Sequence, residues 1–293
     1  MKKINLKKVA AVAMSLVMVL GMAACGSDEK TDENAGADAD AEVDFENSER
    51  IQEIKDSGKL VTGTSADYAP FEFHTKIDGE DTIVGFDIAI AQKVADSLGV
   101  ELEVVDMAFD SLLISLNNDD FDMVMASLTP DEERKKAVDF SDAYFKGGYV
   151  ILVRAEDAEK YTTQESLEGQ SVAAQKGSTL VPQANSVVGE ENVVQLVKVG
   201  DMVTELLNGK VEAVFLDSVI AAGYEAMNED LVVVDIGLEH TTEGNCVAVK
   251  KGDTDLAAYI NEVLAGLTQE DIDQMMIDAQ KLAGTAEEES TEE

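Results

Sequence analysis

Apolar residues follow two alternating patterns along the chain from about Gly58 onward. Every fourth residue from Phe86 to Leu98 is apolar, which is the spacing of one helix face, and Gly99 follows as a stop signal. Shorter apolar or alternating runs are typical of strands. Strands are predicted at 60–64, 101–107, 122–126, 148–153, 171–175, 211–216, 231–236 and 245–250. Further helices are predicted at 110–116, 201–207, 218–227, 255–267 and 270–283, and another is expected to open at 129–132.

This alternation of strands and helices predicts an α/β fold with mostly parallel sheets. No internal repeat is present. Roughly 230 residues carry the pattern, which is enough chain for two lobes. In open α/β sheets, ligands bind beyond the carboxyl ends of the strands, often at helix N-termini. Polar residues at those junctions are therefore the first candidates for a site.

The N-terminal segment 1–24 has the pattern of a secretion signal rather than of a fold. Four lysines precede the apolar run 9–22, which is too short for a membrane span, and small residues lead to Cys25. We expect a lipoprotein signal peptide and a lipidated Cys25. The alternative is ordinary cleavage after an Ala-x-Ala-like site, which Met22 fits less well.

Two further segments lack the composition of a packed core. Residues 25–49 are rich in Asp, Glu, Ala and Gly, and residues 284–293 are similar. Such sequences cannot bury enough apolar surface to offset the entropy of ordering. We expect a disordered acidic tether and an acidic tail.

The net charge of the chain limits the kinds of molecule that it can bind. The chain has 60 acidic and 22 basic residues, for a net charge of −38. Such a protein is repelled by nucleic acids and by anionic surfaces, so we expect no nucleic-acid binding and membrane attachment only through the lipid anchor. Cys246 is expected to be a small apolar residue of its strand. His74 and His240 offer no metal-ligand spacing, and we expect no metal and no cofactor.

Three predicted junctions carry polar residues. The first combines Ser127 and Thr129 with Arg134, one turn into a helix that Thr129 is expected to cap. The second contains Gln175 and Thr179, and the third is Asp217. They would meet at the carboxyl ends of their strands.

Together these junctions could bind a zwitterion. The planar guanidinium of Arg134 matches a carboxylate, and Asp217 would pair with an ammonium. Taken alone, Arg134 is more often a surface ion pair with Asp131 or Glu133. Asp217 alone is as often the N-cap of a helix that begins at Ser218. The combination favours the site.

Two aromatic residues would complete a pocket. Tyr68 lies in a loop after the first strand, and Phe109 precedes a predicted cap at Asp110. A buried ligand needs apolar walls beside a few polar groups. By themselves, both rings are more often part of a core.

The same residues resemble the bacterial extracellular solute-binding proteins of family 3, which serve polar amino-acid ABC importers. The resemblance covers about 60–251 and keeps the order of the family's motifs. The matching runs are 63–73, 84–88, 129–141, 175–179 and 214–217.

This resemblance implies the two-lobed periplasmic-binding-protein type II fold with two hinge crossings. Lobe 1 would comprise 50–145 plus 240–283, and lobe 2 would comprise 146–239. Tyr68 and Phe109 would enclose the ligand side chain, while Arg134 and Asp217 would hold its carboxylate and ammonium. The implied ligand-binding residues are Ser65, Tyr68, Phe109, Ala126, Ser127, Thr129, Arg134, Gln175, Thr179 and Asp217.

Three departures from the family pattern stand out. Many relatives have Asp at the position of Ser65, and its absence weakens the case for a cationic ligand without excluding one. The sequence 244–246 replaces a small-aromatic-glycine pattern near the second hinge. The helix 270–283 lacks a Trp-Phe ending, which bears on its packing and not on the site.

The resemblance also implies a function. We expect a monomeric, extracytoplasmic receptor that delivers a free amino acid to an ABC permease and its ATPase. A neutral polar ligand such as glutamine is the first expectation, and arginine is the second. The alternatives are an enzyme of the cyclohexadienyl dehydratase kind, for which the cleft offers no obvious acid beside Asp217, and a sensory module, which would usually continue into a membrane helix.

Overall fold

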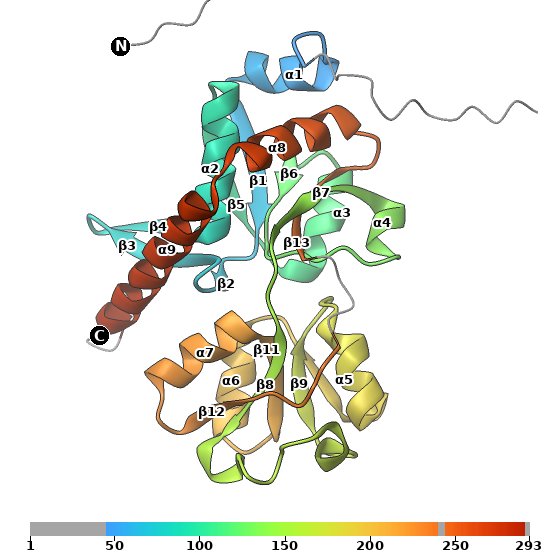
Figure 1. The fold of residues 1–293 in the computed structure, drawn as a ribbon, viewed down its shortest axis with the longest axis vertical. Helices are drawn as coiled ribbons and strands as arrows, with labels where there is room; N and C mark the ends of the chain where they lie inside the picture. The colour runs from blue at the N-terminus through green and yellow to red at the C-terminus, as the bar shows by residue number, and fades with distance from the viewer. Residues whose placement is uncertain (1–44, 240–243, 291–293) are drawn as a thin grey trace, which may run out of the picture. The chain divides into compact units, whose positions relative to one another are not determined.

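The computed structural model describes residues 45–239 and 244–290, with side chains up to 284. The predicted signal peptide, Cys25 and His240 lie outside the described residues. Those described belong to one compact unit. Two five-stranded sheets organise them, one in the upper and one in the lower half of Figure 1.

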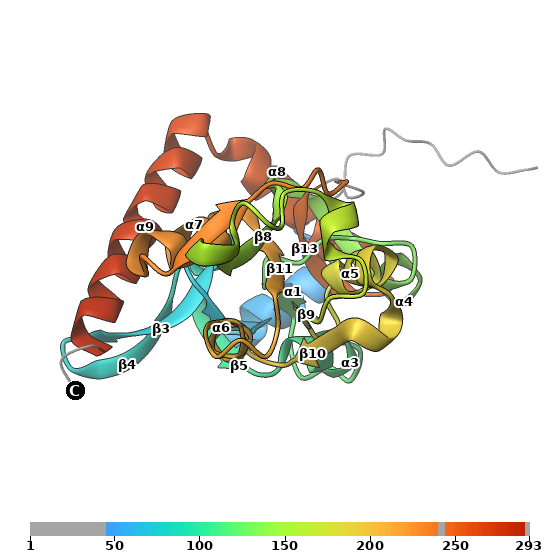
Figure 2. The same ribbon diagram turned by 90° about the horizontal axis from the view of Figure 1, so that it is seen from below.

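Lobe 1 is built on a sheet with the strand order β5-β1-β6-β13-β7. β1 pairs in parallel with β5 and β6, whereas β13 runs antiparallel to β6 and β7. A small sheet, β2-β3-β4, lies beside α9 (Figure 2). The strands are β1 (Lys59–Thr64), β2 (Asp67–Tyr68), β3 (Glu72–Ile77), β4 (Glu80–Val84), β5 (Glu101–Asp106), β6 (Met123–Val124), β7 (Val138–Phe145) and β13 (Asn245–Lys250). The helices are α1 (Glu49–Ser57), α2 (Phe86–Leu98), α3 (Leu112–Asn117), α4 (Arg134–Ala137), α8 (Thr254–Gly266) and α9 (Gln269–Ser290).

Lobe 2 is built on a sheet with the strand order β10-β9-β11-β8-β12. β9 pairs in parallel with β10 and β11, and β8 runs antiparallel to β11 and β12. The strands are β8 (Tyr149–Arg154), β9 (Val172–Gln175), β10 (Val193–Leu196), β11 (Ala213–Asp217) and β12 (Leu231–Val234). The helices are α5 (Leu180–Val188), α6 (Val199–Leu207) and α7 (Ser218–Met227), with a short 3-10 turn at Gln164–Leu167.

The chain crosses between the two sheets twice. It leaves β7 at Phe145 and enters β8 at Tyr149, a crossing visible in Figure 1. It returns between Val234 of β12 and Asn245 of β13. Two sheets with two crossings are the architecture predicted from the sequence. The lobe boundaries at individual residues stay a prediction.

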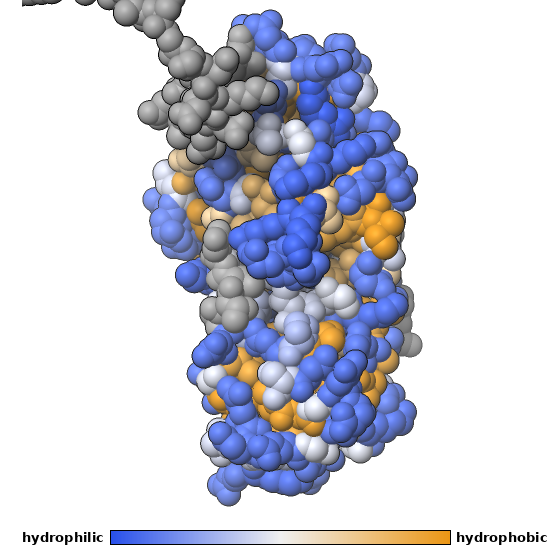
Figure 3. All heavy atoms as spheres, turned by 90° about the vertical axis from the view of Figure 1, so that its right-hand side faces the viewer, coloured by the Kyte–Doolittle hydropathy of each residue, from blue (hydrophilic) through white to orange (hydrophobic). Residues whose placement is uncertain are grey.

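Helix α2 shows how the apolar pattern produces its element. Phe86, Ile90 and Val94 are fully buried, so the every-fourth-residue face packs into lobe 1. Gly99 ends the helix in the left-handed conformation with φ 73°, and its N–H bonds to carbonyl groups of the last turn. A few large hydrophobic residues, such as Ile114 and Met227, are exposed elsewhere on the surface. Hydrophilic residues predominate on the side shown in Figure 3, as the charge of −38 requires.

Several local predictions are wrong. The folded region begins before the predicted end of the tether at 49, because Phe45 packs edge-on against Tyr259 and Ser48 caps α1. Helix α9 continues to Ser290, into the segment predicted as a tail from 284. Composition alone reveals neither the ring contact and helix cap at the first end nor the continuation of the helix at the second.

Other errors concern helix starts and a missed hairpin. α6 begins at Val199, with Lys198 and not Asp201 at the N-cap position. Asp110 lies inside a 3-10 turn (Phe109–Ser111), and Ser111 occupies the N-cap position of α3. The sequence also did not predict the β3–β4 hairpin, whose two strands carry few apolar residues.

The tight contact at Gly85 gives a test of this packing. Gly85 has φ 135°, and a Cβ added there would lie 2.1 Å from the carbonyl oxygen of Phe71. We expect Gly85→Ala to lower the unfolding free energy by about 3 kcal/mol, from backbone strain and overlap together. Urea denaturation measures the loss. Gly223→Ala is the control, because a Cβ in α7 meets no atom within 4 Å, and equal midpoints for both variants would contradict the expectation.

Candidate functional site

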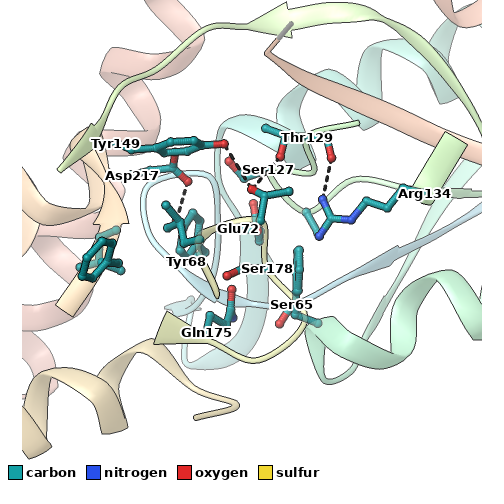
Figure 4. A pocket seen from close by; sticks show the side chains of 16 residues that line it. Ser65, Tyr68, Glu72, Ser127, Thr129, Arg134, Tyr149, Gln175, Ser178 and Asp217 are labelled. Carbon is teal, nitrogen blue, oxygen red and sulfur yellow. Dashed lines mark hydrogen bonds between the residues drawn. The ribbon is translucent and has the colours of Figure 1, made fainter. Parts of the chain in front are cut away.

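A cavity between the two lobes is lined by all ten sequence-predicted site residues. Figure 4 shows this cavity from close by. Residues from β2, β3, α4, β9 and β11 are among those that line the cavity. Six more residues line it that the sequence did not single out. These are Glu72, Tyr149, Ser178, Leu180, Phe215 and Leu216.

Arg134 reaches the cavity from lobe 1 as the first residue of α4. Its guanidinium donates to the carbonyl of Thr129 at 2.6 Å and, across the cleft, to the carbonyl of Gly177 at 2.9 Å. The Phe109 ring lies beneath it, with the Cζ atom 5.4 Å from the ring centroid. Burial lowers the pKa of Arg134, although a guanidinium stays charged at neutral pH. Two hydrogen bonds leave donors of the five-donor fork for a ligand.

The predicted cap of this helix is wrong. Asp131, and not Thr129, accepts hydrogen bonds from the N–H groups of Glu133 and Arg134, at 2.9 and 2.7 Å. The helix is four residues long, so Arg134 stands at its start and not one turn inside it. Asp131 lies 3.9 Å from Arg134, which makes the surface ion pair a weak competitor for the guanidinium.

Asp217 ends β11 on the opposite side of the cavity (Figure 4). It occupies the N-cap position of α7, but its side chain makes no capping hydrogen bond. Instead the carboxylate accepts a hydrogen bond of 2.5 Å from the hydroxyl of Tyr68 in lobe 1. Burial raises the pKa of Asp217 to about 6, and the Tyr68 hydrogen bond opposes that rise. A nearby cation would favour the ionised form.

A chain of hydroxyl groups connects the lobes beside these charges. The hydroxyl oxygens of Thr129 and Thr179 lie 3.2 Å apart, and that of Tyr149 lies 3.3 Å from Thr179. Tyr149 faces Asp217 in the β8–β11 pairing, so the sheet register brings it to the site. No local pattern in the sequence predicts that register. Hydroxyl groups can donate or accept, which suits a ligand that carries both kinds of group.

Ser127 lines the cavity, but not all of its polar groups are available to a ligand. Its backbone is left-handed, with φ 49°, and its N–H donates to Asp87 at 2.7 Å. Its hydroxyl accepts a 2.6 Å hydrogen bond from Asn245 of β13. The N–H is therefore used inside lobe 1, whereas the hydroxyl proton is still available to a ligand.

The remaining predicted residues complete the walls. Gln175 is held in lobe 2 by a 3.3 Å hydrogen bond from its side-chain amide to the carbonyl of Val197. The Ser65 hydroxyl lies 3.4 Å from Asp67. Ala126 and Phe109 add apolar surface. This combination of apolar walls and a few oriented polar groups is typical of a small-molecule site.

Further contacts hold the lobes together around the cavity. Asp67 of lobe 1 accepts a 2.9 Å hydrogen bond from the N–H of Val199, the first residue of α6. That N–H would otherwise be one of the unpaired donors of a helix start. Lys176 forms a 2.7 Å ion pair with Asp110 across the same cleft. The lobes are therefore in a closed arrangement.

The described part of the chain contains no cluster of His, Cys, Asp and Glu suited to a metal ion. His74 is exposed on β3, with its ring nitrogens near Asp81 and Asp106. Cys246 is buried in β13, as a small apolar residue would be. Among the described helices, none has the length and apolarity to cross a bilayer.

The family model of the bacterial extracellular solute-binding proteins, family 3, matches residues 60–276. The chain belongs to this family. Its proteins are extracytoplasmic, and the resemblance drawn from the sequence motifs is confirmed.

Two curated relatives from Bacillus subtilis (strain 168) are similar over most of their length. The arginine-binding extracellular protein ArtP is 34% identical over 216 residues, which are 70% of this chain and 79% of ArtP. The ABC transporter glutamine-binding protein GlnH is 34% identical over 264 residues, 88% of this chain and 92% of GlnH. The two names carry different amino acids at equal identity, so identity alone does not choose a ligand.

Solved structures share the two-lobed fold. An amino acid ABC transporter substrate-binding protein from Streptococcus pneumoniae, bound to L-arginine, aligns with TM-score 0.76 and 37% identity, covering 79% of this chain and 98% of that one. The ancestral amino-acid-binding protein AncCDT-1, a precursor of cyclohexadienyl dehydratase, aligns with TM-score 0.71 and 33% identity, covering 78% and 98%. The predicted fold class is thereby confirmed.

The buried carboxyl of Asp87 predicts how stability depends on pH. Burial raises its pKa from 3.8 to about 6, against hydrogen bonds from Ser127, Tyr144 and Glu72. Between about pH 4 and 6 the folded protein therefore keeps a proton that the unfolded chain has lost. The contribution of Asp87 to the unfolding free energy should fall as pH rises through this window and level off above it.

Asp87→Asn should remove up to about 3 kcal/mol of this pH-dependent fall. Urea denaturation at pH 4.5, 5.5 and 7.5 measures it. Asp56→Asn, at an exposed position of α1, should keep the wild-type slope. An unchanged slope in Asp87→Asn would show that this carboxyl ionises normally.

Proposed function

We propose that this protein captures one free α-amino acid between its lobes as the substrate-binding component of an amino-acid ABC importer. Arg134 binds the carboxylate, and Asp217 binds the ammonium. The observation that carries the proposal is that two opposite charges, one from each lobe, line a single cavity. A zwitterion neutralises both when the lobes close on it.

The energetics favour a bridging ligand. A buried charge is costly unless it is paired, and both Arg134 and Asp217 pay this cost in the closed arrangement. A ligand carboxylate beside the first and an ammonium beside the second would offset it. Such a ligand binds the closed form better than the open form, so it shifts the population toward closure.

A binding role is favoured over catalysis, although one argument for it from the sequence was wrong. The cleft does hold a second acid beside Asp217, because Glu72 lines the same cavity. The support for binding is that the curated relatives ArtP and GlnH carry the names of binding proteins. The bound amino acid should therefore be recovered chemically unchanged.

The setting of the protein follows from the same proposal. The closed form docks on a membrane permease that an ATPase drives, and the protein acts as a monomer. Lipidation at Cys25 keeps it at the outer face of the cell membrane. Acyl chains anchor by burying methylene groups, at about 0.8 kcal/mol each.

Replacement of Arg134 tests the carboxylate contact. Arg134→Ala should weaken binding of the preferred amino acid at least about 100-fold, because it leaves the ligand carboxylate buried and unpaired. Titration calorimetry against the common amino acids gives the affinities. Lys135→Ala removes an exposed charge one residue away and should bind normally. Heat from none of the amino acids with the wild type would refute the proposed function, and retained affinity in Arg134→Ala would place the carboxylate elsewhere.

The hydrogen bond of Asp67 to α6 should stabilise closure. Asp67→Ala leaves the Val199 N–H without its partner in the closed form, whereas the open form loses nothing. We expect about tenfold weaker ligand binding, mainly through faster dissociation, measured by stopped-flow competition. The control is Asp201→Ala, an exposed acid in the first turn of the same helix. Equal dissociation rates in the two variants would show that the contact does not control closure.

A further inference from the structure

Glu72 is the pocket residue that the zwitterion does not explain. It is the first residue of β3, its side chain lines the cavity, and it is only 1% exposed. Figure 4 places it between Ser127 and Tyr68, above Ser178. Its Oε2 atom has no hydrogen-bond partner among the described residues. A buried polar atom without a partner at the wall of a binding cavity is a candidate ligand contact.

Behind Glu72 lies a second carboxyl, that of Asp87, and the hydrogen bond between the two side chains holds Glu72 in its protonated form. Asp87 of α2 uses its Oδ2 atom to accept hydrogen bonds from the Ser127 N–H and the Tyr144 hydroxyl, both at 2.7 Å. Asp87 is itself fully buried. Burial, and then the neighbouring carboxyl of Asp87, raise the pKa of Glu72 well above its ordinary value. Glu72 therefore keeps its proton while no cation is near.

The charged and titratable groups around Glu72 are mostly acidic. Only Arg134 is basic among the ionisable residues that line the cavity with it. The groups that face or influence Glu72 are Asp87 from α2, Asp67 and Tyr68 from β2, Tyr144 from β7, Asp217 from β11 and Arg134 from α4. The local field thus favours a positive charge.

The charges that line the cavity indicate which ligand side chain Glu72 would favour. In the proposed complex, Arg134 is matched by the ligand carboxylate and Asp217 by its ammonium. Glu72 is left over, so a neutral ligand side chain leaves it protonated. A cationic side chain instead pairs with the carboxylate and releases the proton to water. Among cations, a guanidinium has a planar pair of donors for a carboxylate and a flat face that packs against aromatic rings such as Tyr68.

We propose that Glu72 determines specificity for the ligand side chain and selects a guanidinium, with release of one proton from Glu72 to water on binding. This inference rests on the proposed function and goes beyond it, because the ligand's backbone groups do not fix its side chain. The only bond that breaks is the O–H bond of Glu72. It also reverses the first expectation of a neutral ligand, which the absence of an acid at Ser65 had favoured.

Calorimetry with L-arginine and L-glutamine tests the inference. Each is titrated into wild type and Glu72→Gln at pH 6, 7 and 8, in phosphate and in Tris, whose ionisation enthalpies differ. The wild type should bind arginine more tightly than glutamine. Any amino acid should displace the proton that Asp217 holds near pH 6, and arginine should release close to one proton more than glutamine at each pH. Because Glu72 loses a proton on binding, arginine affinity should rise with pH, by up to about tenfold per unit while free Glu72 is protonated.

Glu72→Gln should bind arginine about 100-fold more weakly without the additional proton release, and bind glutamine within about threefold of the wild type. Glu80→Gln is the matched control, because Glu80 is an exposed acid at the start of β4 in the same hairpin. It should behave as the wild type. Glu72→Asp keeps the acid and shortens it, so it should retain the additional proton release at lower affinity. Melting by circular dichroism checks that each variant is folded.

The outcomes separate the two levels of the proposal. If the wild type binds no amino acid, the proposed function fails. If it binds glutamine more tightly than arginine with no additional proton release for arginine, the proposed function stands and the role of Glu72 is refuted. Unchanged arginine affinity and proton release in Glu72→Gln would also refute it, because another group would then be the acid.

Discussion

The cost of burying charge governs the cavity between the lobes. Arg134, Asp217 and Glu72 all lie where water is largely excluded, and none has a full charge partner within its own lobe. Charges in such places are held only if a partner arrives or a proton is kept or lost. The shifted pKa values of Asp217 and Glu72 are the signature of that constraint. The proposed amino-acid ligand would supply these partners.

Closure depends on the same constraint. The contacts around the cavity that join the lobes are polar ones, such as the Tyr68–Asp217 hydrogen bond and the Lys176–Asp110 ion pair. Each is worth little on its own, because water replaces it when the lobes part. The balance between open and closed forms can then be tipped by one ligand. Two hinge crossings allow that movement while leaving each sheet intact.

Glu72 adds a second layer to the site. In the proposed complex, the contacts to the zwitterion are common to all amino acids, whereas Glu72, held against Asp87, would distinguish ligands by the charge of their side chains. Because Glu72 is protonated when no cation is bound, the pocket avoids the cost of a second buried negative charge beside Asp87. This division assigns affinity to groups in both lobes and selectivity to a residue deep in lobe 1.

Much of the fold was predictable because its signals are local. The buried face of α2 and its Gly99 stop, and the strand β13, followed from periodicity and from residue type. The local signals failed where the deciding contact is distant. Thr129 was predicted to cap a helix, yet Asp131 accepts the hydrogen bond from the first N–H of α4. For Asp217 the sequence left two roles open, and the structure shows its carboxylate accepting a hydrogen bond from Tyr68 instead of capping α7. The β3–β4 hairpin, with little apolar surface, left no periodic pattern to find.

The sequence by itself determined the family, the two-sheet architecture and the ten residues that come to line one cavity, because motifs in order and strand ends are one-dimensional properties. The tertiary structure alone decided how those residues are used. Sheet register brings Tyr149 opposite Asp217, and the packing of β3 on α2 buries Glu72 against Asp87. Burial and charge proximity depend on all neighbours at once. For that reason the pKa values and the surplus acid in the pocket could not be predicted from the order of residues.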